Sequence, residues 1–339
     1  MKKLFIISNE RIFESKNKYF CDNLDMKSTP EGLNRGFEVN IIARKSKKKR
    51  SHEINVVNVN LSGSIFSFLK KIINSIKSEE SKYLVISISP YTFLACILLK
   101  FFKKKPIVYL RSDGYGEYKA ILGFIGVAFY HLMFIITSRI SRLVSCRDYI
   151  LRNRKGNIVS PSQLDKDWFN NFKTIDLKDF KLLYVGRIRV EKGIFSLLRL
   201  IKDKNNISLT IVGAEKSTSL DINQSNVIIK ENESNKNKLI NFYDNHNIFV
   251  LPSFTEGHPM SILEALARKR PIVIFEEIKH VIGKKKGIFV SKRNYASFLE
   301  TIEYIKENYT KIQEEMKQNQ LPTNKDFIKE MESLISNLN

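Results

Sequence analysis

LLYVGRIRVEKGI, at positions 182–194, decides the fold class. Its first half is a short apolar run, Gly186 makes a turn, and a helical pattern begins near Lys192. Similar apolar runs alternate with longer helical patterns along most of the chain, which is typical of parallel α/β sheets with helices on both faces. The stretch LPSFTEGHPMSILEALA at 251–267 repeats the order of strand, polar turn and helix. The sequence therefore predicts an α/β protein built from Rossmann-like sheets.

The length of 339 residues suits two domains, because one domain usually holds roughly 100 to 200 residues. We expect a Rossmann-like domain over 1–165, a linker over 166–179 where the apolar pattern weakens, a second Rossmann-like domain over 180–320, and closing helices of which the last spans 321–339. The expected strands span 4–8, 38–43, 54–59, 83–89, 107–110, 143–146 and 157–159 in the first half, and 181–185, 208–212, 227–229, 248–251 and 272–274 in the second. Helical stretches are expected between these strands, for example at 65–76. Two helices with solvated faces are expected after residue 294, separated by a break at Pro322.

The composition favours a folded protein of the cytoplasm. Hydrophobic residues make up 43% of the chain, whereas disordered chains lack the apolar surface needed to offset the entropy of ordering. Cys21, Cys96 and Cys146 are odd in number and lie far apart, without the spacing of a disulfide framework or a zinc site. The apolar run near Met1 is shorter than the core of a signal peptide, so we expect a first buried strand there.

The formal net charge of +22 raises the question of an anionic partner, because such a field attracts phosphate-rich polymers and anionic membranes alike. A general bias toward lysine, asparagine and isoleucine is an equally good explanation. Residues 120–137 are almost wholly apolar and nearly long enough to span a bilayer, which takes roughly 20 residues, but we favour a crossover helix buried on its sheet. The helix expected at 91–102 is apolar and ends at Lys103-Lys104-Lys105, which suits a lipid surface or a core helix with a basic cap.

Both quoted stretches place phosphate-binding groups directly after a strand. Gly186 permits a tight turn, and Arg187 and Lys192 can converge on a diphosphate and neutralise the charge that develops as a sugar leaves. In the second stretch Pro259 suits the first turn of a helix, where its missing amide is not needed. Phosphate is attracted by the free amides at the start of that helix, which belong to Met260, Ser261 and Ile262.

Two acids frame the turn of the second stretch. Glu256 lies in the turn and Glu264 lies just over one turn inside the helix, so both can face one crevice. Carboxylates bind phosphate poorly but accept hydrogen bonds from neighbouring sugar or ribose hydroxyls. The pair therefore predicts a hydroxyl-rich ligand. His258 lies between the acids and can reach a phosphate or a hydroxyl, while its glycine and proline neighbours suggest a partly conformational role.

Together these residues resemble family 4 of the retaining glycosyltransferases, and in particular the enzymes of bacterial surface polysaccharides. That family has the GT-B fold, in which two Rossmann-like domains face each other across a cleft. Gly186-Arg187 to Lys192-Gly193 looks like its diphosphate motif, and residues 252–265 look like its paired-glutamate motif, in the same order and spacing. The resemblance is clear over residues 180–274. It implies that Arg187 and Lys192 contact the donor diphosphate, Glu256 contacts the donor sugar near the reacting carbon, and Glu264 holds the ribose hydroxyls.

The first half follows the family only in outline. Ser8-Asn9-Glu10-Arg11 replaces the glycine pair that usually follows the first strand. Where the family often has a histidine at the cleft-facing end of a strand, the candidate here is Asp113, with Arg111 and Gly114 beside it on the acceptor side. Asp165-Lys166-Asp167 matches a short metal-binding motif of other glycosyltransferases but lies in the expected linker. We therefore assign no metal and no other cofactor.

These features predict an enzyme that transfers a sugar from a nucleoside diphosphate donor, with UDP as the commonest nucleotide, to a hydroxyl of a lipid-linked oligosaccharide. The resemblance implies that the anomeric configuration is retained. The acceptor would belong to a bacterial O-antigen, capsule or lipopolysaccharide, and the enzyme would lie in the cytoplasm, peripheral on the anionic inner face of the cell membrane. One alternative is a related enzyme with a soluble acceptor. The other, a basic nucleic-acid-binding protein, leaves Glu256 and Glu264 without a role, so no nucleic-acid partner is expected.

Overall fold

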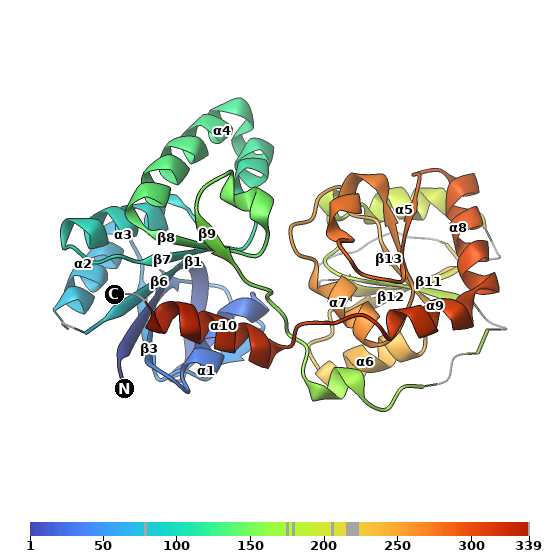
Figure 1. Cartoon of the computed structure of the whole chain (residues 1–339), viewed down its shortest axis with the longest axis horizontal. Helices are drawn as coiled ribbons and strands as arrows, with labels where there is room; N and C mark the ends of the chain where they lie inside the picture. The colour runs from blue at the N-terminus through green and yellow to red at the C-terminus, as the bar shows by residue number, and fades with distance from the viewer. Residues whose placement is uncertain (78–79, 174–175, 178–179, 205–206, 215–223, 338–339) are drawn as a thin grey trace. The chain divides into compact units, whose positions relative to one another are not determined.

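The computed structural model describes residues 1–77, 80–173, 176–177, 180–204, 207–214 and 224–337. The chain forms two compact units (Figure 1). The first contains residues 1–163 and 323–339, and the second contains residues 164–322. Each unit has its own largely parallel sheet, covered by helices, and its own apolar core. The predicted α/β class is confirmed.

The sheet of the first unit has the strand order β5-β3-β1-β6-β7-β8-β9, and all of these neighbours are parallel. The strands are β1 (Lys3–Ser15), β2 (Lys18–Cys21), β3 (Glu38–Lys45), β4 (His52–Ile54), β5 (Asn58–Ser62), β6 (Lys82–Ile86), β7 (Ile107–Leu110), β8 (Arg142–Ser145) and β9 (Gly156–Ile158). The helices are α1 (Leu24–Leu33), α2 (Ile65–Ile76), α3 (Pro90–Phe101), α4 (Gly114–Ile140), the short η1 (Asp148–Leu151) and α10 (Asn324–Ser336). The strand predicted at 107–110 and the helix predicted at 65–76 have the predicted bounds.

Consecutive side chains of β1 enter two different cores. Leu4 and Ile6 pack in the core that includes α1 and α10, whereas Phe5 and Ile7 pack in the core that includes α2, α3 and α4. Side chains alternate between the two faces of a strand, so a strand covered on both faces needs apolar residues at every position. This requirement explains the continuous apolar run near the N-terminus.

The first strand extends well beyond the predicted bounds of 4–8. β1 continues to Ser15, with a shift in its register against β3 between Ile7 and Arg11. Its second half pairs with β2, which pairs with β4, and both of these pairings are antiparallel. Ser8-Asn9-Glu10-Arg11 therefore lies within an extended strand that carries a small antiparallel ribbon.

The apolar stretch 120–137 forms much of α4, and the prediction that it is buried on its sheet is wrong for its N-terminal part, where large apolar side chains are exposed. Helical geometry breaks at Gly123, where φ is 62° and ψ is −143°. Among the described residues, α4 is the one helix long and apolar enough to cross a membrane by length and composition. The break divides it into two shorter segments, 114–122 and 124–140.

Helix α10 completes the first unit, although it follows the second unit in the sequence. Its buried residues join the core of the first unit, and they are Phe327, Ile328, Met331 and Ile335. It packs on α1, where a Cβ added at Gly32 would lie 2.5 Å from Ile328 Cδ1. The expectation of two closing helices with solvated faces is therefore wrong. The described residues after 294 form α8 (Tyr295–Glu307), α9 (Tyr309–Met316) and α10, and each of these helices buries an apolar face.

We expect Phe327→Ala to lower the free energy of unfolding by about 3–5 kcal/mol, because it removes a side chain that is only 1% exposed and leaves a cavity. Lys329→Ala, on the exposed face of the same helix, is the matched control and should change it little. Chemical denaturation gives the two values. Hydrogen exchange should place the loss in the strands of the first unit, and a loss confined to the second unit would contradict the packing of α10.

The second unit has the strand order β12-β11-β10-β13-β14-β15, with all neighbours parallel. The strands are β10 (Lys181–Val185), β11 (Ser208–Ala214), β12 (Val227–Glu231), β13 (Ile248–Leu251), β14 (Ile272–Phe275) and β15 (Ile288–Ser291). Besides α8 and α9, its helices are α5 (Ile194–Leu200), α6 (Lys236–Asp244), α7 (Met260–Ala267) and the short η2 (Lys166–Phe169), η3 (Val190–Lys192) and η4 (Glu276–Val281). The strands predicted at 181–185 and 248–251 have the predicted bounds.

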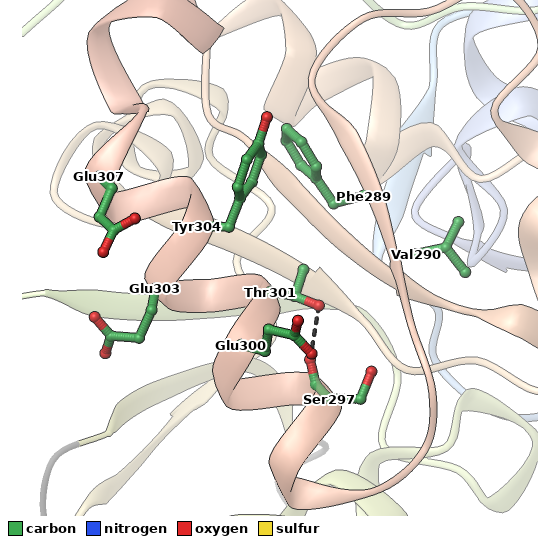
Figure 2. A pocket seen from close by; sticks show the side chains of 8 residues that line it. All are labelled: Phe289, Val290, Ser297, Glu300, Thr301, Glu303, Tyr304 and Glu307. Carbon is green, nitrogen blue, oxygen red and sulfur yellow. Dashed lines mark hydrogen bonds between the residues drawn. The ribbon is translucent and has the colours of Figure 1, made fainter.

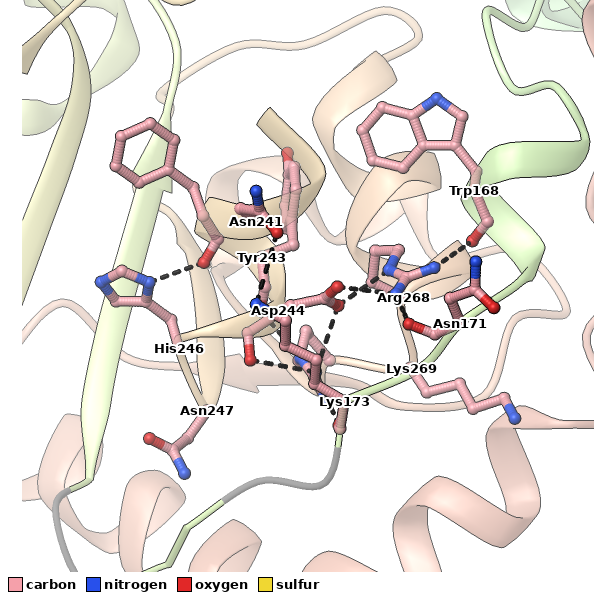
Figure 3. A network of polar contacts seen from close by, with 12 residues as sticks. Trp168, Asn171, Lys173, Asn241, Tyr243, Asp244, His246, Asn247, Arg268 and Lys269 are labelled. Carbon is pink, nitrogen blue, oxygen red and sulfur yellow. Dashed lines mark hydrogen bonds and ion pairs between the residues drawn. The ribbon is translucent and has the colours of Figure 1, made fainter. Parts of the chain in front are cut away.

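A buried ion pair connects α6 and α7 to the segment that opens the second unit (Figure 3). The Arg268 guanidinium, which is fully buried, donates two hydrogen bonds to the Asp244 carboxylate, of 2.8 Å from Nε and 2.7 Å from Nη2. It also donates to the backbone carbonyls of Trp168, Asn170 and Asn171. A buried charge is stable only when it is paired and hydrogen-bonded in this way. The chain around residue 170 is thereby fixed to the second unit.

Candidate functional site

The residues of the two sequence motifs meet where the strand order of the second unit reverses. β10 lies at the centre of the sheet, with β11 on one side and β13 on the other. The chain moves outward in one direction after β10 and in the other after β13. In open parallel sheets, ligands bind at this point, beyond the carboxyl ends of the two strands. The first motif follows β10 and the second follows β13.

The turn after β10 is held by two hydrogen bonds. The Gly186 amide donates to the Val212 carbonyl oxygen at 2.9 Å, which continues the sheet by one residue. The Tyr184 hydroxyl donates to the Arg187 carbonyl oxygen at 2.8 Å. Arg187 is exposed beyond the end of the strand. Its charged group is therefore carried on a turn whose backbone is fixed.

The two turns touch at Gly193, between η3 and α5. Its φ of +68° lies in the left-handed region, and an added Cβ would lie 1.8 Å from the Pro252 carbonyl oxygen. Only glycine satisfies both conditions. The Phe254 amide also donates to the Glu191 carbonyl oxygen at 3.0 Å. The backbones that carry the two motifs are therefore in direct contact.

This contact brings Lys192 next to Glu256. Lys192 Nζ lies 2.7 Å from Glu256 Oε1, and the Glu256 side chain is only 8% exposed. The buried Ser253 hydroxyl donates to the same carboxylate oxygen at 2.6 Å. Sequence reasoning identified Lys192 and Glu256 but not Ser253. A serine at the end of a strand is too common to be singled out without the structure.

Two further residues support the second turn, and sequence reasoning assigned neither of them. His280 of η4 has its Nε2 2.7 Å from the Glu256 carbonyl oxygen. Arg293 donates to the Pro252 carbonyl oxygen at 3.1 Å, pairs with Glu277 and stacks on the rings of two phenylalanines. No local pattern in the sequence marks these partners, because each contact joins segments that are distant along the chain.

Glu264 lies in α7 in a different electrostatic setting from Glu256. Its Oε2 accepts a hydrogen bond of 2.7 Å from the Tyr243 hydroxyl of α6. Burial raises the pKa of the Glu264 carboxyl from 4.5 to about 7, against the lowering effect of that hydrogen bond. Glu256 has a cationic partner, whereas the hydrogen bond to Glu264 comes from a neutral hydroxyl. Tyr243 is a further residue that the sequence did not indicate.

The start of α7 carries the predicted phosphate-binding amides. Pro259 is the N-cap, one residue before the expected place in the first turn. The first three helical residues are Met260, Ser261 and Ile262, and first-turn amides have no partner within their own helix. The Tyr243 hydroxyl that binds Glu264 also lies 3.4 Å from the Ser261 carbonyl oxygen. His258 is half-buried in the turn between the two acids.

The acceptor-side candidates lie in the first unit, after β7. The Asp113 side chain accepts a hydrogen bond from the Tyr115 amide and so caps α4, and it pairs with Arg152 at 3.2 Å. Arg111 pairs with Asp25 at 3.6 Å. Gly114 is buried at the first position of α4. These contacts give Asp113 a structural role, and its part in acceptor binding stays a prediction.

The Asp165-Lys166-Asp167 segment makes ion pairs with the chain itself. The two carboxylates both pair with Lys236 of α6, at 2.5 Å in the case of Asp165. Within the described residues, no group of three or more His, Cys, Asp or Glu side chains has an arrangement that could hold a metal ion.

A shallow depression elsewhere on the second unit contains none of the predicted site residues (Figure 2). It is lined by residues of β15 and α8, namely Phe289, Val290, Ser297, Glu300, Thr301, Glu303, Tyr304 and Glu307. The carboxylates on the helix side would repel a diphosphate. The depression is therefore a poor alternative to the switch point as a donor site.

Residues 165–321, which include both motifs, match the family model described as glycosyl transferases group 1. The match, together with the relatives named below, shows that the chain is a glycosyltransferase. Over 310 residues the glycosyltransferase is 25% identical to the capsular polysaccharide biosynthesis glycosyltransferase CapM of Staphylococcus aureus, across 79% of this chain and 80% of CapM. A shorter match, 25% identical over 122 residues, is to the putative teichuronic acid biosynthesis glycosyltransferase TuaC of Bacillus subtilis, across 35% and 31% of the two chains.

Solved structures share the fold of the whole glycosyltransferase. HepE of Anabaena, in complex with UDP and glucose, aligns with a TM-score of 0.69 and 10% identity over 100% of both chains. WaaG, a glycosyltransferase of lipopolysaccharide biosynthesis, aligns with a TM-score of 0.64 and 11% identity over 98% of this chain and 100% of that one. The predicted GT-B fold is confirmed by these alignments.

We expect Gly193→Ala to destabilise the glycosyltransferase more than Gly283→Ala does. Both glycines have positive φ, +68° and +57°, and this strain costs an alanine about 1–2 kcal/mol. A Cβ at Gly283 meets nothing nearer than Lys285 Nζ at 3.8 Å, whereas at Gly193 it would collide with Pro252. Equal unfolding free energies for the two variants, measured by chemical denaturation, would show that the turns are not in contact.

The raised pKa of Glu264 predicts a pH dependence of stability. Between about pH 4.5 and 7 the folded protein keeps a proton on Glu264 that the unfolded chain releases, so the free energy of unfolding should fall as the pH rises, by up to about 3 kcal/mol. Glu264→Gln should remove this dependence. Glu300→Gln, at an exposed carboxylate of α8, is the control and should retain it. The measurement is denaturant unfolding at several pH values, and parallel curves for wild type and Glu264→Gln would contradict the prediction.

Proposed function

We propose that this glycosyltransferase transfers a sugar from a UDP-sugar to a hydroxyl of a lipid-linked oligosaccharide in the synthesis of a bacterial surface polysaccharide. The observation that carries the donor assignment is the 2.7 Å pair of Lys192 and Glu256 at the switch point of the second sheet. The pair supports the proposal because it brings a cation and a carboxylate together in the two turns, the second of which leads into α7. Retention of the anomeric configuration is part of the proposal and rests on the family resemblance.

The donor diphosphate is bound by positive charge from two turns. Lys192 has three N–H donors, of which one is directed at Glu256, so the others are available to phosphate oxygens. Arg187 adds a guanidinium from the exposed end of the first turn. The first-turn amides of α7 supply the positive end of a helix dipole. These groups stabilise the leaving diphosphate, and the proposal includes no metal ion or other cofactor.

The two glutamates have different tasks because their surroundings differ. Glu256 is held by Lys192 and Ser253, so its orientation toward the reacting sugar carbon is fixed. Glu264 binds the ribose hydroxyls as a carboxylate, which accepts hydrogen bonds with both oxygens. With a pKa of about 7, its ionised form prevails only above neutral pH. Donor binding is therefore tighter at pH 8 than at pH 6.

The acceptor assignment is supported by the relatives. CapM and TuaC are named for the biosynthesis of a capsular polysaccharide and of teichuronic acid, both of which are surface polymers. WaaG is named for lipopolysaccharide biosynthesis. The structure of HepE in complex with UDP and glucose supports the choice of a UDP-sugar as the first donor to test.

The test is release of nucleoside diphosphate from a panel of nucleotide sugars, with lipid-linked glycans extracted from membranes as acceptor and with EDTA present. One donor should give acceptor-dependent release. Arg187→Ala and Glu264→Ala should each lower it by roughly 100-fold or more, because each removes a group that binds the donor in the transition state. Arg199→Ala and Glu303→Ala, which are exposed positions of α5 and α8, should keep the wild-type rate.

The proposal would be overturned if no donor in the panel gave acceptor-dependent release of nucleoside diphosphate. Full activity in Arg187→Ala and Glu264→Ala would overturn it as well. If release depended on a soluble oligosaccharide and not on the lipid-linked glycan, the proposed acceptor would be wrong, whereas the proposed donor site would stand. If the enzyme were active without EDTA and inactive with it, the proposal that no metal ion is needed would be wrong.

A further inference from the structure

Helix α4 folds back on itself as a hairpin. The rings of Tyr115 and Tyr130 have centroids 4.9 Å apart, and Tyr118 and Tyr130 have centroids 5.1 Å apart. In one straight helix, residues 115 and 130 would be about 22 Å apart. A Cβ at Gly126 would lie 2.2 Å from the Tyr118 carbonyl oxygen, so the two segments are in backbone contact near the turn. Gly123, with its positive φ, makes that turn.

The turn of this α4 hairpin is covered by large apolar side chains that face solvent. We call these residues the hairpin tip, and they are Ile121, Leu122, Phe124 and Ile125, with exposed fractions of 73%, 54%, 83% and 78%. Figure 1 shows the end of α4 standing clear of the sheet of the first unit. The hairpin begins directly after β7, at the carboxyl edge of that sheet. Single exposed apolar residues are ordinary on a protein surface, but a contiguous cluster of this kind marks a contact surface.

The charge around the hairpin tip is positive. No acidic residue occurs between Glu117 and Asp148. Lys119 lies beside the tip, with its Nζ 5.7 Å from the centre of the Phe124 ring. At the base of the hairpin, the Arg152 guanidinium stacks on the Tyr115 ring at 4.9 Å, and Arg154 is exposed two residues further on. Most of the net charge of +22 also lies in the first unit.

We propose that the α4 hairpin docks the glycosyltransferase on an anionic bilayer, with the hairpin tip inserted among the acyl chains and Lys119 and Arg154 at the lipid phosphates. An apolar element of this kind enters the membrane by about 5–10 Å. At that depth the hairpin tip lies among the acyl chains, while Lys119, just before the tip in the sequence, stays near the phosphates. Neither helical segment has the roughly 20 residues needed to span a bilayer. The hairpin therefore rests in one leaflet.

The chemistry of the surface favours lipid over a second copy of this chain. A protein partner would have to present acidic groups to the cations and an apolar socket to the tip at once. An anionic leaflet provides both in layers, because phosphates lie above acyl chains along its whole surface. The exposed apolar residues of α3, which are Leu94, Ile97, Phe101 and Phe102, extend apolar surface along the neighbouring helix.

The test is co-sedimentation with vesicles that contain phosphatidylglycerol and phosphatidylcholine, and with vesicles of phosphatidylcholine alone. It needs neither donor nor acceptor, so it stands or fails separately from the proposed reaction. The wild type should bind the anionic vesicles. Phe124→Asp combined with Ile125→Asp should weaken binding at least tenfold, whereas Val57→Asp, at a side chain that is 88% exposed elsewhere in the first unit, should not. Thermal unfolding confirms that all variants remain folded.

A charge variant and a fluorescence variant complete the test. Lys119→Gln combined with Arg154→Gln should weaken binding to the anionic vesicles and reduce the dependence of binding on salt, because fewer charges of the protein face the lipid phosphates. Lys47→Gln combined with Lys49→Gln, which removes the same charge elsewhere in the first unit, is the matched control and should have a smaller effect. The single native tryptophan, Trp168, is buried in the second unit. Emission added by Phe124→Trp should therefore shift to the blue when anionic vesicles are added.

Three results would overturn the proposal. The first is binding to anionic vesicles that is unchanged in Phe124→Asp with Ile125→Asp. The second is no blue shift at position 124 while the protein is bound. The third is an absence of vesicle binding together with a dimer, detected by sedimentation velocity, that the same double variant abolishes. That last result would assign the hairpin tip to an interface between two copies of the chain.

Discussion

The contact between the Gly193 backbone and the Pro252 carbonyl oxygen is the constraint on which the proposed donor site depends. It joins the turn after β10 to the turn after β13, at a separation that no side chain other than hydrogen permits. The pairing of Lys192 with Glu256 and the placement of Ser253 follow from that separation. Arg293 and His280 act from outside by binding carbonyl oxygens of the second turn. The site is therefore built from backbone contacts first and side-chain chemistry second.

The environments of the two acids illustrate how one short segment can carry two chemistries. Glu256 pairs with Lys192, and the positive charge of this lysine offsets the repulsion between the carboxylate and the diphosphate of the proposed donor. Glu264 lies eight residues after Glu256, its hydrogen bond comes from the neutral Tyr243 hydroxyl, and burial opposes its ionisation. A ligand that brings hydroxyl donors offsets this cost.

Much of the fold, including the strands that lead into the two turns of the candidate site, could be predicted from the sequence, because parallel strands covered on both faces are continuous apolar runs. The runs at 107–110, 181–185 and 248–251 are short and almost wholly apolar, which favours buried parallel strands. The helix at 65–76 has clear amphipathic spacing. Contacts between distant segments could not be predicted, since nothing beside Glu264 in the chain indicates Tyr243. The extension of β1 and the break at Gly123 were also missed. A glycine within an apolar run is compatible with a continuous helix, and it is the packing of Gly126 on Tyr118 and of the Tyr115 ring on Tyr130 that shows that the chain turns back.

The return of α10 to the first unit has a consequence for biosynthesis. The ribosome adds about 5–20 residues per second, and domains generally fold during synthesis, with the N-terminal domain first. Here the core of the first unit lacks Phe327, Ile328 and Met331 until α10 (Asn324–Ser336) has emerged. The second unit, by contrast, is complete in sequence by residue 322. The part of the chain that is translated first is thus completed last, and until then part of the apolar surface of its core is exposed to water.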